Sequence, residues 1–395
     1  MNFRKRVLAS LGAGALGLTA ASAFATPALA DAGVDVAIES AGGTIGDYVS
    51  SKPIKVTLVN KHATEAAENI LVKVDTNGLL PGVKFDGDEC GGIQDDGFVY
   101  CGIEGDALPA GARIDWSFWL ELTAGDAGDY GKIKITIEHD GEDPDLSNNS
   151  TTLDIKVAKK TGPDLAVIAY DVDSKVEDRD EDEYPVLGGA LHPGEEGAVL
   201  YDVANFGDEP AWGVRVTVNL PEGVTFTEVE PDCAYSDDNR KAVCTYPDLT
   251  MISFDDWAEG KEGRFGVHFW NYVTVAAGVK APVTLTEGMV TVEALEPQLT
   301  VLNKSTKAAL PENARPLTED REFGEIDPSD NSDKFNVIVA GSGGEGGGSL
   351  PVTGAQAGLI GGIGAAVVIA GAALFLMARR RKVVLVTPDD EKSSN

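Results

Sequence analysis

Four cysteines have the most sharply defined chemistry in this chain of 395 residues. Cys90 and Cys101 are separated by the same interval as Cys233 and Cys244. In a secreted chain four cysteines allow three pairings. Zinc ligation fits poorly because no histidine lies near either pair, and a redox pair would have a much shorter spacing. We therefore expect structural disulfides, Cys90–Cys101 and Cys233–Cys244 if each half of the chain folds alone, each contributing about 3 kcal/mol in the chain-entropy description.

Histidines and serines form no recognisable catalytic or cofactor motif. The four histidines are scattered and have no ligand spacing: His62, His139, His192 and His268. Nucleophile elbows, P-loops and dinucleotide fingerprints are absent from the sequence. We therefore expect no enzymatic activity and no bound cofactor.

Acidic residues offer two weak alternatives for calcium, a cation that prefers carboxylate oxygens. The run Glu177–Glu183 lacks the spacing of a calcium-binding loop, and a solvated loop is the better interpretation. The second alternative is Asp143–Asp145, which has a counterpart around Asp327.

Tryptophans are the remaining candidates for ligand contact. Trp119 and Trp270 are expected in the core because they occupy matched positions of a repeat described below. Trp257 lies in an unmatched insertion, Asp255–Glu262, and is the better candidate for a ligand-binding surface.

The middle of the chain is an internal repeat. Landmarks recur in the same order: Asp35–Ile38 with Asp164–Val167, Asn60 with Asn205, Leu80–Phe85 with Leu220–Phe226, Arg113 with Arg264, and Asp145 with Asp327. The repeat predicts two domains, residues 31–158 and residues 163–340.

Each copy has the alternating pattern of half-buried strands, as in Lys132–Glu138 and Val214–Val218. Helical periodicity is best over His62–Asn69, a short stretch. We expect an all-β protein of two tandem immunoglobulin-like β-sandwich domains.

The sequence of each copy also resembles a known type of domain. The Leu-Pro-Gly-Val stretch at Leu80–Val83, the cysteine pair and a closing strand with the pattern Asp-x-x-x-Asn-Ser resemble the conserved-repeat domain of bacterial surface proteins, with the CARDB-type adhesion module as a near relative. The resemblance implies a sandwich on an exported protein and implies no enzymatic activity.

Residues 1–30 have the features of a signal peptide. A basic start, Arg4–Arg6, precedes an apolar stretch, and Ala28-Leu29-Ala30 predicts cleavage between Ala30 and Asp31. An earlier site at Ala23–Ala25 and an uncleaved N-terminal anchor are the alternatives.

The C-terminal region has three consecutive parts after the Gly/Ser linker 341–349. A short motif consists of Leu350, Pro351, Val352, Thr353 and Gly354. Residues 355–378 are uncharged and long enough to form a transmembrane helix. The tail 379–395 begins with a basic cluster typical of a cytoplasmic stop-transfer signal, Arg379, Arg380, Arg381 and Lys382.

These three parts resemble the sorting signal of LPxTG wall-anchored surface proteins of Gram-positive bacteria, and the Ala/Gly-rich helix is similar to actinobacterial members. The resemblance implies that a sortase cysteine attacks the Thr353 carbonyl, expels Gly354 and passes Thr353 to an amine of a peptidoglycan precursor.

We expect no nucleic-acid partner, because a chain with a formal charge of −32 is repelled by phosphate backbones. We expect a secreted, peptidoglycan-anchored protein of the cell wall that passes through the membrane as a single-pass intermediate. Its role would be structural or adhesive, with a glycan or matrix protein as the ligand to seek. The alternatives are a wall-anchored carbohydrate-active hydrolase and an uncleaved single-pass membrane protein.

Overall fold

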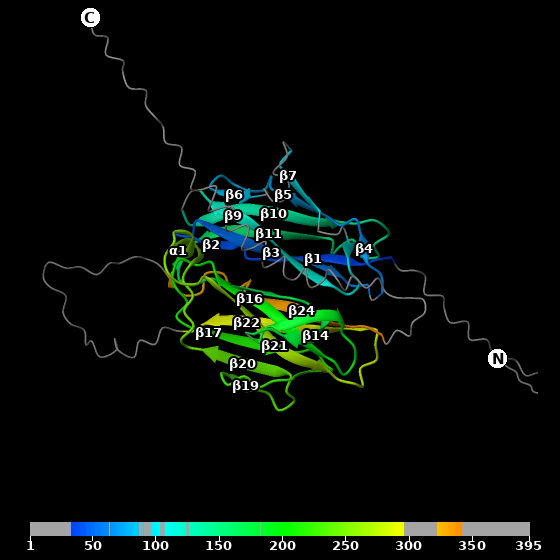
Figure 1. The fold of residues 1–395 in the computed structure, drawn as a ribbon. Coiled ribbons are helices and arrows are strands. Elements are labelled where there is room, and N and C mark those ends of the chain that lie inside the picture. The colour runs from blue at the N-terminus through cyan, green and yellow to red at the C-terminus, as the bar shows by residue number, and fades with distance from the viewer. Residues whose placement is uncertain are drawn as a thin grey trace, which may run out of the picture. The chain divides into compact units, whose positions relative to one another are not determined.

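The computed structural model describes residues 33–295 and 322–341, except 63, 87–89, 91–95, 103–106, 124–125 and 182. The predicted signal peptide, most of the linker, the sorting motif, the membrane helix and the basic tail lie outside these residues. Strands dominate, and α1 (Phe254–Ala258) is the one α-helix of the described part (Figure 1). The prediction of an all-β protein is confirmed. None of the described helical structure is both apolar and long enough to cross a membrane.

The first repeat contains two sheets. One has the strand order β1 (Val36–Ala41), β3 (Ser51–Asn60), β9 (Arg113–Leu122) and β6 (Val83–Asp86). The other has the order β2 (Thr44–Gly46), β11 (Ser150–Ala158), β10 (Gly128–Glu138), β5 (Leu71–Asp75) and β7 (Phe98–Gly102). Neighbouring strands are antiparallel, except that β2 runs parallel to β11.

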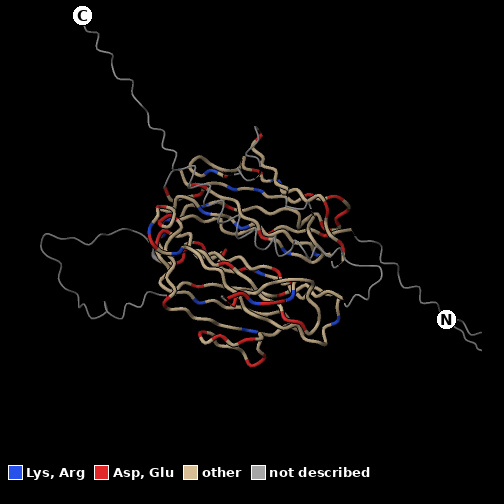
Figure 2. Tube along the Cα trace, viewed as in Figure 1, with Lys and Arg blue, Asp and Glu red and all other residues tan. Residues whose placement is uncertain are grey.

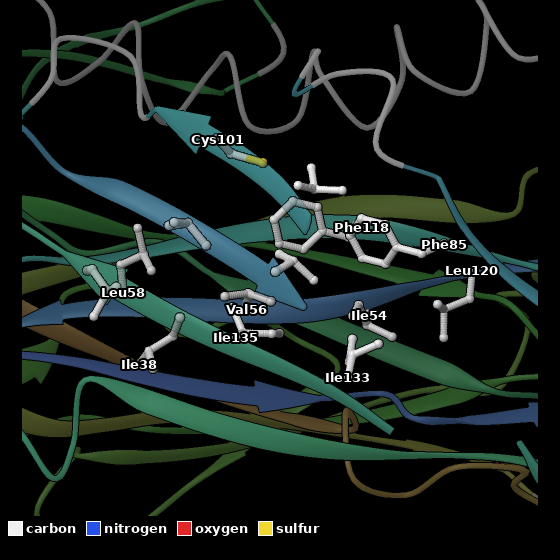
Figure 3. Close-up of a cluster of buried hydrophobic side chains, with 14 of the residues drawn as sticks. Ile38, Ile54, Val56, Leu58, Phe85, Cys101, Phe118, Leu120, Ile133 and Ile135 are labelled. Carbon is white, nitrogen blue, oxygen red and sulfur yellow. The ribbon is translucent and has the colours of Figure 1, made fainter. Parts of the chain in front are cut away.

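Alternating side chains of both sheets form one core, which Figure 3 shows from within. In β10 the isoleucines Ile133, Ile135 and Ile137 are buried. Lys132 precedes Ile133, Lys134 lies between Ile133 and Ile135, and both lysines face solvent. Burying one such aliphatic side chain contributes about 1.5–3 kcal/mol, so the core explains why the alternating pattern folds as a sandwich.

The second repeat has the same arrangement. One sheet has the order β13 (Leu165–Ala169), β16 (Glu196–Asn205), β21 (Gly266–Val275) and β18 (Val224–Phe226). The other has the order β19 (Cys233–Tyr235), β20 (Lys241–Tyr246), β17 (Val214–Asn219), β22 (Val283–Ala294) and β24 (Ser332–Val339). A parallel bridge between Val172 and Val337 replaces the β2–β11 pair.

Three short strand pairs complete the described structure. They are β4 (Ala67–Glu68) with β8 (Ala107–Leu108), β12 (Lys160–Thr161) with β23 (Glu322–Phe323), and β14 (Ser174–Arg179) with β15 (Pro185–Ala190). His62–Asn69, the stretch with the best helical periodicity, contains β4, which pairs with β8. The Asn60 amide also donates to the carbonyls of Glu65 and Leu108 and ties this loop to the sheet.

Two landmarks of the repeat have matched structural roles. Asn205 donates to the Glu209 and Met251 carbonyls much as Asn60 does in the first copy. The structure contains the disulfides Cys90–Cys101 and Cys233–Cys244, the local pairs that the repeat predicts. No described strand of one repeat pairs with a strand of the other, yet both repeats belong to one compact unit that begins at Gly33.

Candidate functional site

A buried junction between the two repeats holds the most unusual set of side chains in the described part of the chain. Its apolar part begins with Ile326, which belongs to the second repeat but packs in the core of the first. Beside it, Trp119 of β9 contacts Phe206 and Phe254 of the second repeat, with ring centroids 5.9 and 5.0 Å apart. Each repeat therefore contributes an apolar side chain that packs against the other repeat.

Lys52 is the centre of the polar part. Its ammonium lies 2.7 Å from Asp164, 3.0 Å from Asp330 and 3.4 Å from Asp327, all from the second repeat. The side chains of Lys52 and Asp164 have no exposed surface. The Nζ atom also donates to the Thr44 carbonyl at 3.1 Å, so this buried charge is compensated from several directions.

Further polar contacts cross the junction beside this cluster. Lys55 pairs with Asp333 at 3.1 Å and donates to the Val167 and Ser332 carbonyls. The Arg113 backbone N–H donates to Asp171 at 2.6 Å. The Asn336 amide donates to the Gly111 carbonyl at 2.9 Å.

Two backbone donors of the first repeat end on the same loop of the second. The Thr44 N–H donates to Asp327 at 2.7 Å, and the Gly42 N–H donates to the Ser329 hydroxyl at 3.1 Å. Asp327 is thus a hydrogen-bond acceptor for the first repeat as well as a partner of Lys52.

Burial and local charge move the pKa values of the junction in opposite directions. Burial opposes the charge of Lys52, but the carboxylates of Asp164, Asp330 and Asp327 outweigh it and raise its pKa. Burial raises the pKa of Asp164 and Asp330, and it also raises the pKa of Glu325 to about 7.

Asp171 and Asp327 illustrate the two extremes. Burial raises the pKa of Asp171 to about 7, although two backbone donors favour its charged form. Burial acts on Asp327 too, but Lys52, Ser329 and the Thr44 N–H outweigh it and lower its pKa. The junction therefore contains carboxyls whose protonated form is favoured together with one, Asp327, whose charged form is favoured.

Matched positions of the repeats explain how this cluster arises. In the first copy the Asn148 amide donates to Asp35 at 2.8 Å. Alignment on the Asp145–Asp327 landmark places Asp330 where the first copy has Asn148, and Asp35 matches Asp164. The second copy therefore sets two carboxyls together, and Lys52 of the first copy supplies the missing positive charge.

Several side chains of the two calcium candidates contact other protein groups. Asp143 accepts from the Val36 N–H and the Asn149 amide, and Asp145 accepts from Ser147. In the acidic run, Arg179 pairs with Glu183, with Glu196 and with Glu228. No group of three or more potential metal ligands occurs among the described residues.

Aromatic candidates lie elsewhere than the sequence suggests. Phe118 and Leu120 point into the core, so Trp119 between them faces the junction instead of the core. Trp270 also lies outside the core cluster and packs edge-on against Tyr184. Trp257 is half-buried against Phe265, 4.6 Å away, and is packed within the apolar part of the junction, not presented as an open platform.

One histidine contacts both a carboxylate and a tyrosine hydroxyl, an arrangement that the sequence spacing did not suggest. His268 contacts Asp202 through Nδ1 at 2.5 Å and the Tyr184 hydroxyl through Nε2 at 3.2 Å. Asp202 also accepts from the Tyr170 hydroxyl at 2.6 Å. These contacts pack the β14–β15 hairpin against the sheet.

An open cavity of about 580 Å³ lies at another edge of the junction. Its lining includes Asp208, Glu209, Asp255, Asp256 and Lys261. Asp255 accepts from Ser50 of the first repeat, and Lys261 pairs with Asp256. Asp255 thus links the two repeats, whereas the Lys261–Asp256 pair lies within the second repeat.

Comparisons with known proteins show only distant likeness. No family model and no curated protein sequence matches the chain. The chain has a weak structural likeness to red sea bream transglutaminase, with 10% identity over 78% of this chain and a TM-score of 0.23, and the chain spans 31% of that protein. It is also similar to a putative membrane anchored protein from Corynebacterium diphtheriae, with 9% identity, 81% of this chain and 98% of that chain covered, and a TM-score of 0.20. At these TM-scores neither likeness bears on activity, ligand or location.

Proposed function

We propose that the protein is a non-enzymatic surface protein that a sortase joins to peptidoglycan through Thr353. The observation that carries this proposal is the order of three sequence features: the motif Leu350–Gly354, the uncharged segment 355–378 and the basic residues that follow. A membrane-held chain with an extended motif is what a transpeptidase at the outer face of the membrane needs. Pro351 favours that extended form because it restricts both its own backbone and that of Leu350.

The exported part would present two immunoglobulin-type sandwiches. In the first repeat β1 lies at the edge of one sheet and β2 at the edge of the other. The remaining strands follow the order of immunoglobulin-type domains. The Tyr130 hydroxyl near the start of β10 donates to the Asp126 carbonyl at 2.8 Å. This contact has the geometry of the tyrosine corner found in these folds.

A structural or adhesive role at the wall suits the described surface. Acidic residues occur along the chain of both repeats (Figure 2), and the two disulfides suit an oxidising location outside the cell. The partners of this proposal are the sortase, a peptidoglycan precursor and a glycan or matrix protein as ligand.

Replacing Thr353 tests the attachment. The wild-type chain and Thr353→Ala are expressed in a Gram-positive host that carries a sortase for this motif. We expect wild-type protein to be released only by muralytic digestion, with a peptidoglycan fragment on Thr353 by mass spectrometry. Thr353→Ala should stay in the membrane fraction with residues 355–395 attached.

Val352→Ala is the matched control, because Val352 occupies the variable position of the motif and should remain wall-linked. Wild-type protein found in the membrane with its C-terminus intact would identify an uncleaved single-pass protein. A wall-linked Thr353→Ala protein would exclude Thr353 as the acyl donor.

A further inference from the structure

We propose that protons control the junction between the repeats, which we call the joint. The joint has more buried carboxyls than cations, and protons on the excess carboxyls keep the two repeats docked. Loss of those protons loosens the two repeats. This inference is independent of wall attachment, since it rests only on contacts among described residues of the two repeats.

The charged and titratable groups of the joint come from every element packed there. The first repeat contributes Glu39 of β1, Lys52 and Lys55 of β3, and Arg113 and Asp115 of β9. The second contributes Asp164, Tyr170, Asp171, Asp173, Glu325, Asp327, Asp330, Asp333 and Lys334, with Asp202 and His268 at the rim. Carboxyls clearly outnumber cations, and most of them are buried.

The positive charges are already engaged. Lys52 and Lys55 contact carboxylates at 2.7–3.4 Å. Arg113 and Lys334 both reach Glu39, at 3.3 and 3.6 Å. Lys52 carries one positive charge but contacts three carboxylates, those of Asp164, Asp327 and Asp330. The second oxygen of Asp330 and one oxygen of Glu325 are buried and have neither a hydrogen bond nor an ion pair. An uncompensated buried carboxylate is costly, so a proton is the remaining way to neutralise these groups.

Asp115 adds to the surplus from the first repeat. Burial and the nearby Asp333 raise its pKa, against the effect of Lys55 and the Thr57 hydroxyl. Since Asp115 and Asp333 belong to different repeats, their repulsion exists only while the repeats are docked. Its protonation and docking therefore favour each other.

The sign of the pH effect follows from these directions. A carboxyl with a pKa raised by docking stabilises the docked state fully below its exposed value, about 4. That stabilisation is lost as the pH rises through the docked value, which is about 7 for Asp171 and Glu325. Asp327 behaves oppositely, since its lowered pKa means that its contribution is lost as the pH falls. Docking should be strongest in mildly acidic solution and should weaken toward alkaline pH.

Three backbone N–H groups report on the joint directly, because their acceptors belong to the other repeat. They are Gly42, Thr44 and Arg113, whose partners are Ser329, Asp327 and Asp171. The paired strands β10 and β11 lie wholly inside the first repeat and serve as the internal reference.

Hydrogen exchange of the full chain in mild detergent, followed by mass spectrometry and corrected for intrinsic rates, tests the proposal. Between about pH 5.5 and 8 we expect protection at the three reporters to fall on the order of tenfold for each ionising carboxyl, while β10–β11 stays unchanged. Reporter protection that is flat or rises with pH relative to β10–β11 would overturn the proposal.

Two neutral variants identify the groups. Glu325→Gln keeps an oxygen for the Leu165 N–H, which Glu325 now accepts at 2.8 Å, and Asp171→Asn removes the second titrating group. Each should flatten the pH dependence at Gly42 and Thr44, and the double variant should flatten it further. Asp145→Asn is the control from the matched loop of the first repeat and should keep the wild-type slope. A wild-type slope in the double variant would refute the assignment, and if a variant loses β10–β11 protection, the wild-type series alone decides.

Discussion

Removing the charge of Lys52 tests the structural account most directly. Lys52→Met keeps an unbranched side chain of similar length but leaves Asp164, Asp327 and Asp330 without their shared cation. The change should destabilise both repeats, because these carboxyls would be held together in a space that water does not reach.

The expected magnitude follows from the distances. At an effective dielectric constant of about 20, a unit charge pair at roughly 3 Å interacts by about 5–6 kcal/mol. Desolvation of each buried ion offsets several kcal/mol of this attraction. Removing one member of a buried ion pair typically costs about 3–5 kcal/mol, and we expect Lys52→Met to fall in that range at neutral pH.

Urea unfolding of the full chain, at about pH 7 and about pH 5, measures the effect. The loss should shrink at the lower pH, because Asp164 and Asp330 have raised pKa values and can bind protons when Lys52 is absent. The double variant Lys52→Met/Asp330→Asn should recover part of the loss, since Asn148 occupies the matched position of the first repeat.

Lys61→Met is the control. Lys61 is 46% exposed and lies 3.7 Å from Asp35, so its loss should cost at most about 1 kcal/mol. The reasoning is refuted if Lys52→Met unfolds within about 1 kcal/mol of the wild type, or if its loss is the same at both pH values.

Two further changes test the packing and the covalent links. Ile326→Ala should cost about 2–5 kcal/mol in urea unfolding and lower hydrogen-exchange protection in β10–β11 of the first repeat, because Ile326 is part of that core. Leu146→Ala, in the matched loop and 73% exposed, should change stability by less than about 0.5 kcal/mol, and an equal effect of both would contradict the assigned packing. Replacing Cys90 and Cys101 together by alanine should lower the free energy of unfolding by about 3 kcal/mol; no change in the urea midpoint would show that this loop does not restrain the unfolded chain.

Local sequence patterns predicted the local parts of the fold. Alternation in Lys132–Glu138 predicted a strand with one buried face, and β10 has it. The equal spacing within the cysteine pairs, read together with the repeat, predicted which cysteines join. Both inferences depend on residues close together in the chain, so they did not require the strand order.

The junction escaped prediction because it depends on how the repeats face each other. Trp119 and Trp270 occupy matched positions, which predicted that both are core residues, yet Phe118 and Leu120 point into the core and Trp119 between them faces the junction. A usable signal did exist in the differences between the copies: Lys52 matches a glycine, Gly197, and Asp330 matches an asparagine, Asn148. Complementary charges at matched positions where the two copies have different residues indicate where the copies meet.

This asymmetry limits what the repeats can do separately. The first repeat alone would leave Lys52 and Lys55 without their carboxylates and its core without Ile326, while the second alone would leave Asp164 and Asp330 facing each other. A third copy could not extend the array through the same contacts, because the cations lie on one repeat and the acids on the other. Repeat arrays that grow by stacking use the same interface at every step, whereas the contacts between these two repeats depend on residues that differ between the copies. A ligand bound by such a pair would meet both repeats in one fixed arrangement when the joint is docked, and the pH dependence of the joint would then carry over to binding.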